Sequence, residues 1–340
     1  MISRSGFIGA VGLSLISDAA IATSQRAAQT AEPGKSVALS CKGVGMSRFQ
    51  ANLLLLLAAA MWGGGNVAQK TILEDLDPFS AVGLRALIGG LLVLPLMLCI
   101  REERAGRGWW RSLFNVAGLF AVALTIQQVS YLESSVTNAS FLVNTGAVMT
   151  PLIVWLMTRI RPSIPVILAG LMMLSGSLLM SGGMFASVSR GDAAAFLSAI
   201  FYAFWIVQLE RHMRTFRRPI ATTIAQFLAA ALLALPIGAA CGGFSLHGLY
   251  GAMPELGILG VFSTALAFGL MTVSQRFTTA SHAAIIVGAE SVFGAAAAFL
   301  LLGERPSSIA LLGALLVLAS IVTVALSRQQ VQAVDLPSKA

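Results

Sequence analysis

Apolar stretches of about twenty residues alternate with short polar connections through most of the chain. A helix that crosses a bilayer needs about 20 predominantly apolar residues. The pattern therefore predicts an all-α polytopic membrane protein with ten transmembrane helices. The predicted spans are 51–69, 79–100, 113–132, 138–158, 164–181, 192–210, 219–239, 255–275, 281–302 and 307–327.

Composition favours a membrane environment over an aqueous one. Of the 340 residues, 57% are hydrophobic and 11% are charged, whereas soluble domains carry about 25% charged residues. The net charge of +8 does not indicate a nucleic-acid partner, because the basic residues lie in short clusters between apolar stretches. Cys41, Cys99 and Cys241 lack metal-ligand spacing, and we expect no metal and no cofactor.

The distribution of Lys and Arg between the connections predicts the orientation. With ten spans, fifteen of these residues fall on one side of the membrane and three, Lys70, Arg190 and Arg305, fall on the other. Cytoplasmic connections carry the excess of Lys and Arg. We therefore expect both termini to be cytoplasmic and the protein to lie in a bacterial inner membrane.

An offset of 141 residues relates two halves of the chain. "PFSAVGLRALIGGLLVLP" at 78–95 corresponds to "PIATTIAQFLAAALLALP" at 219–236, and "TNAS" at 137–140 corresponds to "TTAS" at 278–281. Each half holds five spans, and an odd number places the second half upside down relative to the first. The sequence therefore predicts two inverted five-helix repeats, an arrangement that many secondary transporters use.

The domain organisation follows from this repeat. We expect the first repeat to cover residues 49–181, the second to cover 190–327, and a cytoplasmic tail to follow at 328–340. Residues 1–48 are predicted to be an N-terminal tail, because their apolar part is too short to span a membrane. Met46 directly precedes an apolar run that is typical of a membrane-protein start. The tail is therefore either disordered or an over-long gene start.

Several motifs resemble those of the EamA-type transporters of the drug/metabolite transporter superfamily. "MWGGGNVAQK" at 61–70 is similar to the W-G-x-x-N pattern of the family's first helix, and Pro78 and Arg85 match the start of its second helix. "TNASFLVNTGAVMTP" at 137–151 resembles the fourth helix, and "GAESVFGAAAAFLLLGER" at 288–305 resembles the ninth. The family often has Glu-Pro where this chain has Glu290 followed by serine, so a helix-loosening proline is absent.

The resemblance implies a secondary active transporter. Such a protein exports a small metabolite or drug by alternating access, with proton coupling as an option. The family's cavity is lined by helices one, three, four, six, eight and nine. A lipid or nucleotide-sugar-like translocator of the same superfamily is the alternative.

Only two ionisable residues fall clearly inside the predicted spans, Glu290 and Arg85. A charge at the centre of a membrane costs at least about 2.5–3.5 kcal/mol, so such residues mark candidate sites. Glu290 is predicted either to bind a cationic group or to exchange protons. Glycines 63–65 are expected to loosen the first helix and to let a ligand or another helix approach closely. The uncharged candidates for a substrate cavity are Trp62, Asn66, Gln69, Gln127, Asn138, Asn144, Trp205, Gln208, Gln226 and Thr264.

Other classes of membrane protein fit less well. An intramembrane enzyme would need an activated nucleophile or zinc ligands, and the sequence contains neither HExxH nor GxSxG. A channel would usually show a repeated pore motif, and an ATP-driven pump would need a P-loop. We therefore expect a carrier of a small molecule that contacts membrane lipid and no nucleic acid. The oligomeric state stays open.

The predicted topology can be tested with reporter fusions. Fusions after Arg107 and Arg217 should report the cytoplasm, and a fusion at Gly191 should report the outside, because the charge bias fixes the side of each connection. A cytoplasmic signal at Gly191 would contradict the inverted repeat.

Overall fold

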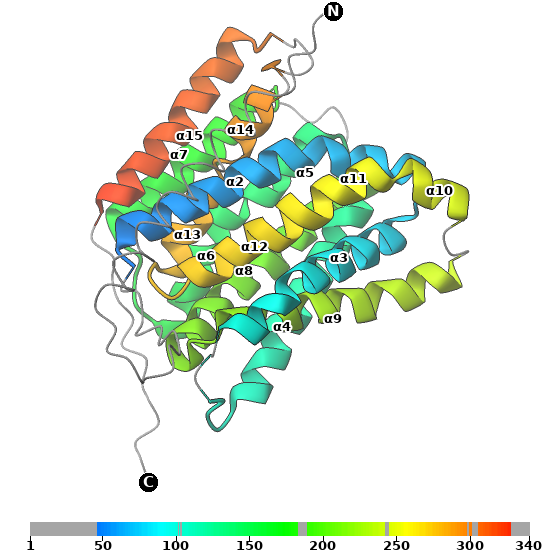
Figure 1. Cartoon of the computed structure of the whole chain (residues 1–340). Coiled ribbons are helices and arrows are strands. Elements are labelled where there is room, and N and C mark those ends of the chain that lie inside the picture. The colour runs from blue at the N-terminus through cyan, green and yellow to red at the C-terminus, as the bar shows by residue number, and fades with distance from the viewer. Residues whose placement is uncertain are drawn as a thin grey trace, which may run out of the picture. The chain divides into compact units, whose positions relative to one another are not determined.

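The computed structural model describes residues 46–100, 102, 104–182, 189–241, 245–297, 299–300 and 305–327. The regular structure within these residues is helical (Figure 1). The expectations for residues 1–45 and 328–340 lie outside the described residues.

The helices follow one another in two runs. The first run comprises α2 (Arg48–Thr71) with η1 (Ile72–Glu74), α3 (Pro78–Cys99), α4 (Trp109–Ser130), α5 (Val136–Asn144), α6 (Gly146–Thr158) and α7 (Ile164–Met180). The second comprises α8 (Arg190–Phe216), α9 (Pro219–Ala240), α10 (Leu246–Gly251), α11 (Met253–Gly257), η2 (Ile258–Leu266), α12 (Ala267–Ser274), α13 (Ala280–Val287), α14 (Glu290–Ala297) and α15 (Ser308–Leu326).

These helices account for the ten predicted spans. Nine described helical segments are long and apolar enough to cross a membrane, and α7 is a shorter apolar helix of 17 residues. At 1.5 Å per residue α7 is about 26 Å long, which is close to the hydrocarbon thickness of about 30 Å. The protein is an all-α polytopic membrane protein, as predicted.

Local signals explain where several spans begin. Ser47 caps α2 and forms a capping box with Gln50, and Ser189 does the same for α8 with Asp192. Asp77 accepts hydrogen bonds from the first turn of α3, where Pro78 occupies the first helical position. Such residues satisfy backbone N–H groups that have no partner inside the helix.

The sixth span is longer than the predicted range 192–210. It continues as α8 to Phe216 and ends at Arg217, which adopts a left-handed conformation with φ of 52°. The charged residues after position 210 indicated a connection. They instead extend the helix, because Arg214 donates to Glu210 across one turn at 2.9 Å.

The fourth and ninth spans are each interrupted near their middle. Thr145 separates α5 from α6, and Gly288 and Ala289 separate α13 from α14. The amides of Gly288 and Ala289 bond to carbonyls three residues earlier, at 3.2 and 3.1 Å, which tightens the turn locally. The ninth span is thus interrupted although it lacks the proline of the family pattern.

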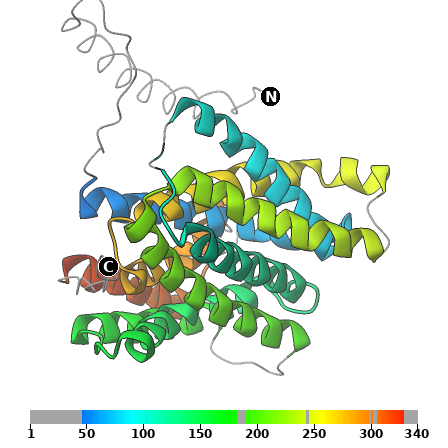
Figure 2. The same cartoon turned by 90° about the horizontal axis from the view of Figure 1, so that it is seen from below.

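The two runs pack against each other through corresponding helices. The second spans, α3 and α9, lie side by side, and so do the fifth spans, α7 and α15 (Figures 1 and 2). The third span of each run packs on the first span of the other, α4 on α8 and α12 on α2. These four contacts recur when the runs are exchanged, which is the packing that two related repeats produce.

Glycines allow several of these helices to approach closely. A Cβ on Gly176 of α7 would lie 2.6 Å from the carbonyl oxygen of Gly313 in α15. A Cβ on Gly63 of α2 would lie 2.5 Å from the carbonyl oxygen of Glu290 and 2.7 Å from the amide nitrogen of Gly294. Residues 63–65 do not interrupt α2, which stays α-helical. The glycine at 63 serves close packing with α14.

Gly63→Ala should destabilise the folded protein by about 1–3 kcal/mol, because the added methyl group overlaps α14 backbone. Gly64→Ala is the matched control, since nothing lies within 4 Å of its Cβ. It should be neutral or slightly stabilising, because alanine favours a helix. Thermal unfolding in detergent measures both variants. Equal melting temperatures would contradict the close packing of α2 on α14.

Candidate functional site

Two cavities meet at Glu290. One has a volume of ≈ 70 Å³ and draws its walls from both runs of helices. The other has a volume of ≈ 370 Å³ and extends toward Val136, Ser181 and Arg305, which lie at helix ends on the predicted outer side. Glu290 lines both. The walls of the smaller cavity are Trp62, Gln69, Arg85, Gln127, Val143, Asn144, Gly146, Ala147, Thr150, Tyr202, Ala203, Trp205, Ile206, Ser263, Phe268, Met271, Ala284, Val287 and Glu290.

Glu290 is the first residue of α14 and follows the interruption of the ninth span directly. Its Oε1 accepts a hydrogen bond of 2.7 Å from Nδ2 of Asn66 in α2. The same Asn66 nitrogen donates to the Ser140 hydroxyl in α5 at 3.2 Å. The carboxylate is therefore held by the first span, and it stands directly after the break in the ninth span.

A chain of hydrogen bonds connects Glu290 to Arg85. Nη1 of Arg85 donates to Oε1 of Gln69 at 3.1 Å, and Nε2 of Gln69 donates to Oδ1 of Asn66 at 2.9 Å. Asn66 then donates to Glu290. All three bonds run in one direction, from the guanidinium to the carboxylate, so each polarises the next. Glu290 and Arg85 thus interact through two amides and form no direct ion pair.

The remaining bonds of Arg85 reach the eighth span. Its Nε donates to the Thr264 hydroxyl and its Nη2 to the Ser263 hydroxyl, both at 2.9 Å. Both hydroxyls lie on η2, which is π-helical. π-Helical turns are uncommon and are often found at functional sites. Here the segment offers two consecutive hydroxyls to one guanidinium, and Arg85 is 1% exposed.

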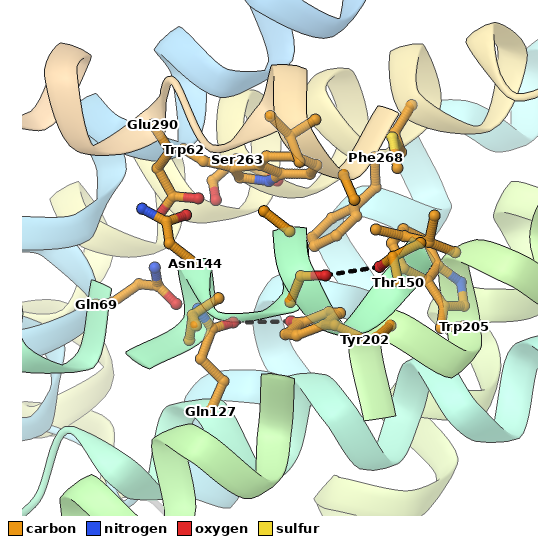
Figure 3. A pocket seen from close by; sticks show the side chains of 18 of the residues that line it. Trp62, Gln69, Gln127, Asn144, Thr150, Tyr202, Trp205, Ser263, Phe268 and Glu290 are labelled. Atoms are coloured by element: carbon orange, nitrogen blue, oxygen red, sulfur yellow. Dashed lines mark hydrogen bonds between the residues drawn. The ribbon is translucent and has the colours of Figure 1, made fainter. Parts of the chain in front are cut away.

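Aromatic rings form the other side of the smaller cavity (Figure 3). The Phe268 ring lies 4.7 Å from the Trp62 ring and 5.8 Å from the Trp205 ring, measured between centroids. Tyr202 and Trp205 contact each other at 5.9 Å. The Trp62 indole donates to the Ser263 carbonyl at 2.9 Å. The cavity thus combines a polar side with an aromatic side, as small-molecule sites commonly do.

Further polar contacts hold the aromatic side in place. The Tyr202 hydroxyl donates to Oε1 of Gln127 at 2.7 Å, and the Trp205 indole donates to Oε1 of Gln226 at 2.5 Å. Gln226 also donates to the Thr272 hydroxyl at 3.3 Å. Gln226 is fully buried, and its bond with the Trp205 indole helps to hold that ring in place.

Most of the residues that the sequence suggested lie together. Two do not. Asn138 lies near the start of α5, where its amide bonds the Ser135 hydroxyl, and Gln208 is half-buried on α8 outside both cavities. The residues brought together are Glu290, Arg85, Trp62, Asn66, Gln69, Gln127, Asn144, Trp205, Gln226 and Thr264.

Sequence reasoning missed several contributors, among them Tyr202, Ser263 and Phe268. Tyr202 lies three residues before Trp205 and so shares its helix face, which was a usable signal. Ser263 precedes a suggested threonine, but only the π-helical turn brings both hydroxyls to one partner. Phe268 looked like any apolar residue of a span.

Ionisable residues near the ends of the spans are buried besides Arg85. Glu210 and His212 on α8 and His282 on α13 are buried as well. Glu210 accepts a bond of 2.7 Å from the Ala280 amide and so caps α13. Glu210 and His282 stand at the ends of the predicted spans 192–210 and 281–302, and only His212 falls outside a predicted span because α8 extends further than predicted.

A membrane protein whose two helical halves surround a polar cavity is built like a secondary transporter. The model of the EamA-like transporter family matches this chain twice, over residues 49–182 and 189–326. The chain belongs to the EamA-like transporter family, and the resemblance to the drug/metabolite transporter superfamily is confirmed. It is an integral membrane protein that acts on a small molecule.

Two further similarities agree with this family. An uncharacterized transporter of Archaeoglobus fulgidus is 26% identical over 284 residues, covering 83% of this chain and 88% of that protein. A solved crystal structure superimposes with a TM-score of 0.67 at 17% identity, covering 82% of this chain and 96% of the other. The second likeness shows the fold alone.

Thr264→Val should destabilise the protein by about 1–3 kcal/mol, because it removes the acceptor of a buried charged donor without changing side-chain size. Thr323→Val is the matched control, because the Thr323 hydroxyl bonds only the carbonyl of Ala319 on its own helix. Thermal unfolding in detergent should separate the two. Equal stability would show that Arg85 does not depend on Thr264.

Proposed function

We propose that this protein is a secondary active transporter that exports a small metabolite or drug by alternating access around Glu290. The observation that carries the proposal is the position of Glu290, which lines both cavities and is bonded to the opposite half through Asn66. A transported molecule or a proton that moves between the cavities along this wall would meet this carboxylate.

The chemistry of Glu290 supports proton coupling. An ionised carboxylate accepts the Asn66 hydrogen bond, whereas a protonated carboxyl also carries a donor. Protonation would weaken the chain of bonds that ends at Arg85. Exchange of a proton at one atom would then loosen the contact between α14 and α2, and these helices belong to different halves.

The difference in closure between the two sides supports alternating access. The ≈ 370 Å³ cavity extends from Glu290 toward the predicted outer side. On the other side, Arg214 forms an ion pair with Glu210 at 2.9 Å. Both residues also bond to backbone at the start of the ninth span: Arg214 donates to the Thr278 carbonyl at 3.3 Å, and Glu210 accepts from the Ala280 amide. The cavity there is only ≈ 40 Å³. Rocking of one half against the other would exchange the open and closed sides.

The size of the smaller cavity favours a small substrate over the lipid or nucleotide-sugar alternative. A cavity of about 150 Å³ binds benzene, and this one has a volume of ≈ 70 Å³. In this conformation it accepts only a compact group.

Glu290→Gln should abolish transport driven by a pH gradient, because an amide cannot take up and release a proton in this range. The protein is reconstituted in proteoliposomes with an entrapped pH dye, and amino acids, polyamines, nucleosides and quaternary amines are added in turn. Substrate-dependent proton movement is the readout. Glu133→Gln is the matched control, because Glu133 is exposed in a connection between helices. This variant should transport as the unsubstituted protein does.

The variant must remain folded for this comparison, so its melting temperature and elution volume are measured alongside. Full flux with unchanged pH dependence in Glu290→Gln would reduce Glu290 to a packing residue. If the unsubstituted protein transports none of these compounds when a gradient is imposed, the proposed transport mechanism itself is contradicted.

A further inference from the structure

Arg85 carries a charge that forms no direct ion pair with any described residue. A guanidinium stays protonated in proteins, and Arg85 is 1% exposed. The ion pairs of the described residues involve Arg214 with Glu210 and Arg218 with Glu102, and none includes Arg85. A buried charge of this kind is usually paired, so the missing partner requires an explanation.

The hydrogen bonds of Arg85 leave part of its guanidinium unused. Its five N–H groups meet three described acceptors, the side chains of Gln69, Ser263 and Thr264. All three acceptors are uncharged. Two N–H groups, one on each terminal nitrogen, have no hydrogen-bond partner among the described residues. A guanidinium that offers one free N–H on each terminal nitrogen can bind two oxygens of one group.

The surroundings of Arg85 point to an anion. Arg85 lines the ≈ 70 Å³ cavity, and so do Gly146 and Ala147, the first two residues of α6. No side chain caps the start of α6, and helix starts carry partial positive charge that favours anions. Half-helix starts at the middle of a membrane serve this role in transporters.

Glu290 does not fill the same place. Gln69 and Asn66 stand between its carboxylate and the guanidinium, and each amide is already bonded on both sides. The positive and negative groups therefore occupy opposite ends of the hydrogen-bonded chain. An anionic group at Arg85 would leave Glu290 free to exchange its proton.

We propose that Arg85 is a carboxylate subsite of the transport cavity, so that the substrate is a small molecule bearing a carboxylate. This inference rests on the proposed function and names its substrate class. A carboxylate matches the paired N–H groups because it presents two oxygens in one plane. The small cavity favours such a group over a bulkier phosphate ester.

Acetate and acetamide provide a direct test, because they are similar in size and differ in charge. Trp62 and Trp205 line the cavity, so their fluorescence should report occupancy. The full chain is titrated in detergent with either compound, at constant ionic strength maintained with chloride. Acetate should change the fluorescence saturably in the presence of chloride, and acetamide should not.

Two variants locate the effect at Arg85. Arg85→Lys keeps the charge but loses the fork, and should weaken acetate binding at least tenfold. Gln69→Glu gives the guanidinium a carboxylate at a position where it already bonds an oxygen, and should abolish the acetate response while Arg85 remains. Arg190→Gln is the control, since it removes one exposed positive charge outside both cavities and should bind acetate normally.

Several results would overturn the carboxylate subsite. They are equal responses to acetate and acetamide, displacement of acetate by chloride at equal concentration, no response in the unsubstituted protein, or normal acetate binding in folded Gln69→Glu and Arg85→Lys. Failure of the transport proposal looks different. In that case acetate still binds at Arg85, but no substrate moves protons across the proteoliposome membrane.

Discussion

The buried guanidinium of Arg85 organises the centre of this protein. A charge inside the membrane costs at least about 2.5–3.5 kcal/mol, and hydrogen bonds to a charged group return about 1.5–3 kcal/mol each. Arg85 makes three of them, to the first and eighth spans, and its chain of amides continues to the ninth. Because Arg85 needs these hydrogen bonds to offset the cost of its charge, the two halves must pack so that its partners stay within bonding distance.

The two halves are alike in packing but differ in chemistry at the corresponding positions. The 141-residue offset places Gln226 where the first half has Arg85. The hydroxyls that bind Arg85 belong to Ser263 and Thr264, and the same offset gives Val122 and Ala123 in the first half. The neutral Gln226 needs no such pair and bonds Trp205 instead. The arginine of the first half thus meets two hydroxyls of the second half, and the corresponding contact of Gln226 with the first half has neither the charge nor the hydroxyls.

Periodicity and charge predict much of this fold, because the bilayer imposes them on the sequence. Spans and connections follow from the need for about 20 apolar residues per crossing, and the repeat follows from segments that match at an offset of 141 residues. Glu290 and Arg85 could be recognised for the same reason, since each violates that pattern. The end of α8 could not be predicted in this way, because charged residues continue a helix beyond the membrane as readily as they form a connection.

The contacts within the site depend on helix rotation, which the sequence does not specify. Asn66, Gln69 and Gln208 look equivalent as polar residues of a span, yet only Asn66 and Gln69 face the partners that complete the chain.

The interruption of the ninth span connects the site to movement. A regular helix ties each residue to its neighbours through backbone bonds, so a residue at its centre moves only with the whole span. Glu290 follows the turn at Gly288 and Ala289, and the helix that it begins, α14, has no buried residue among those described. What holds α14 is mainly α2, through the close approach at Gly63 and the bond from Asn66. The contact at Gly63 depends on the shapes of the two helices, and the bond from Asn66 depends on the ionisation of the Glu290 carboxylate. A change of protonation would alter only the second, so the outer half of the ninth span can respond to a proton while the rest of the packing stays intact.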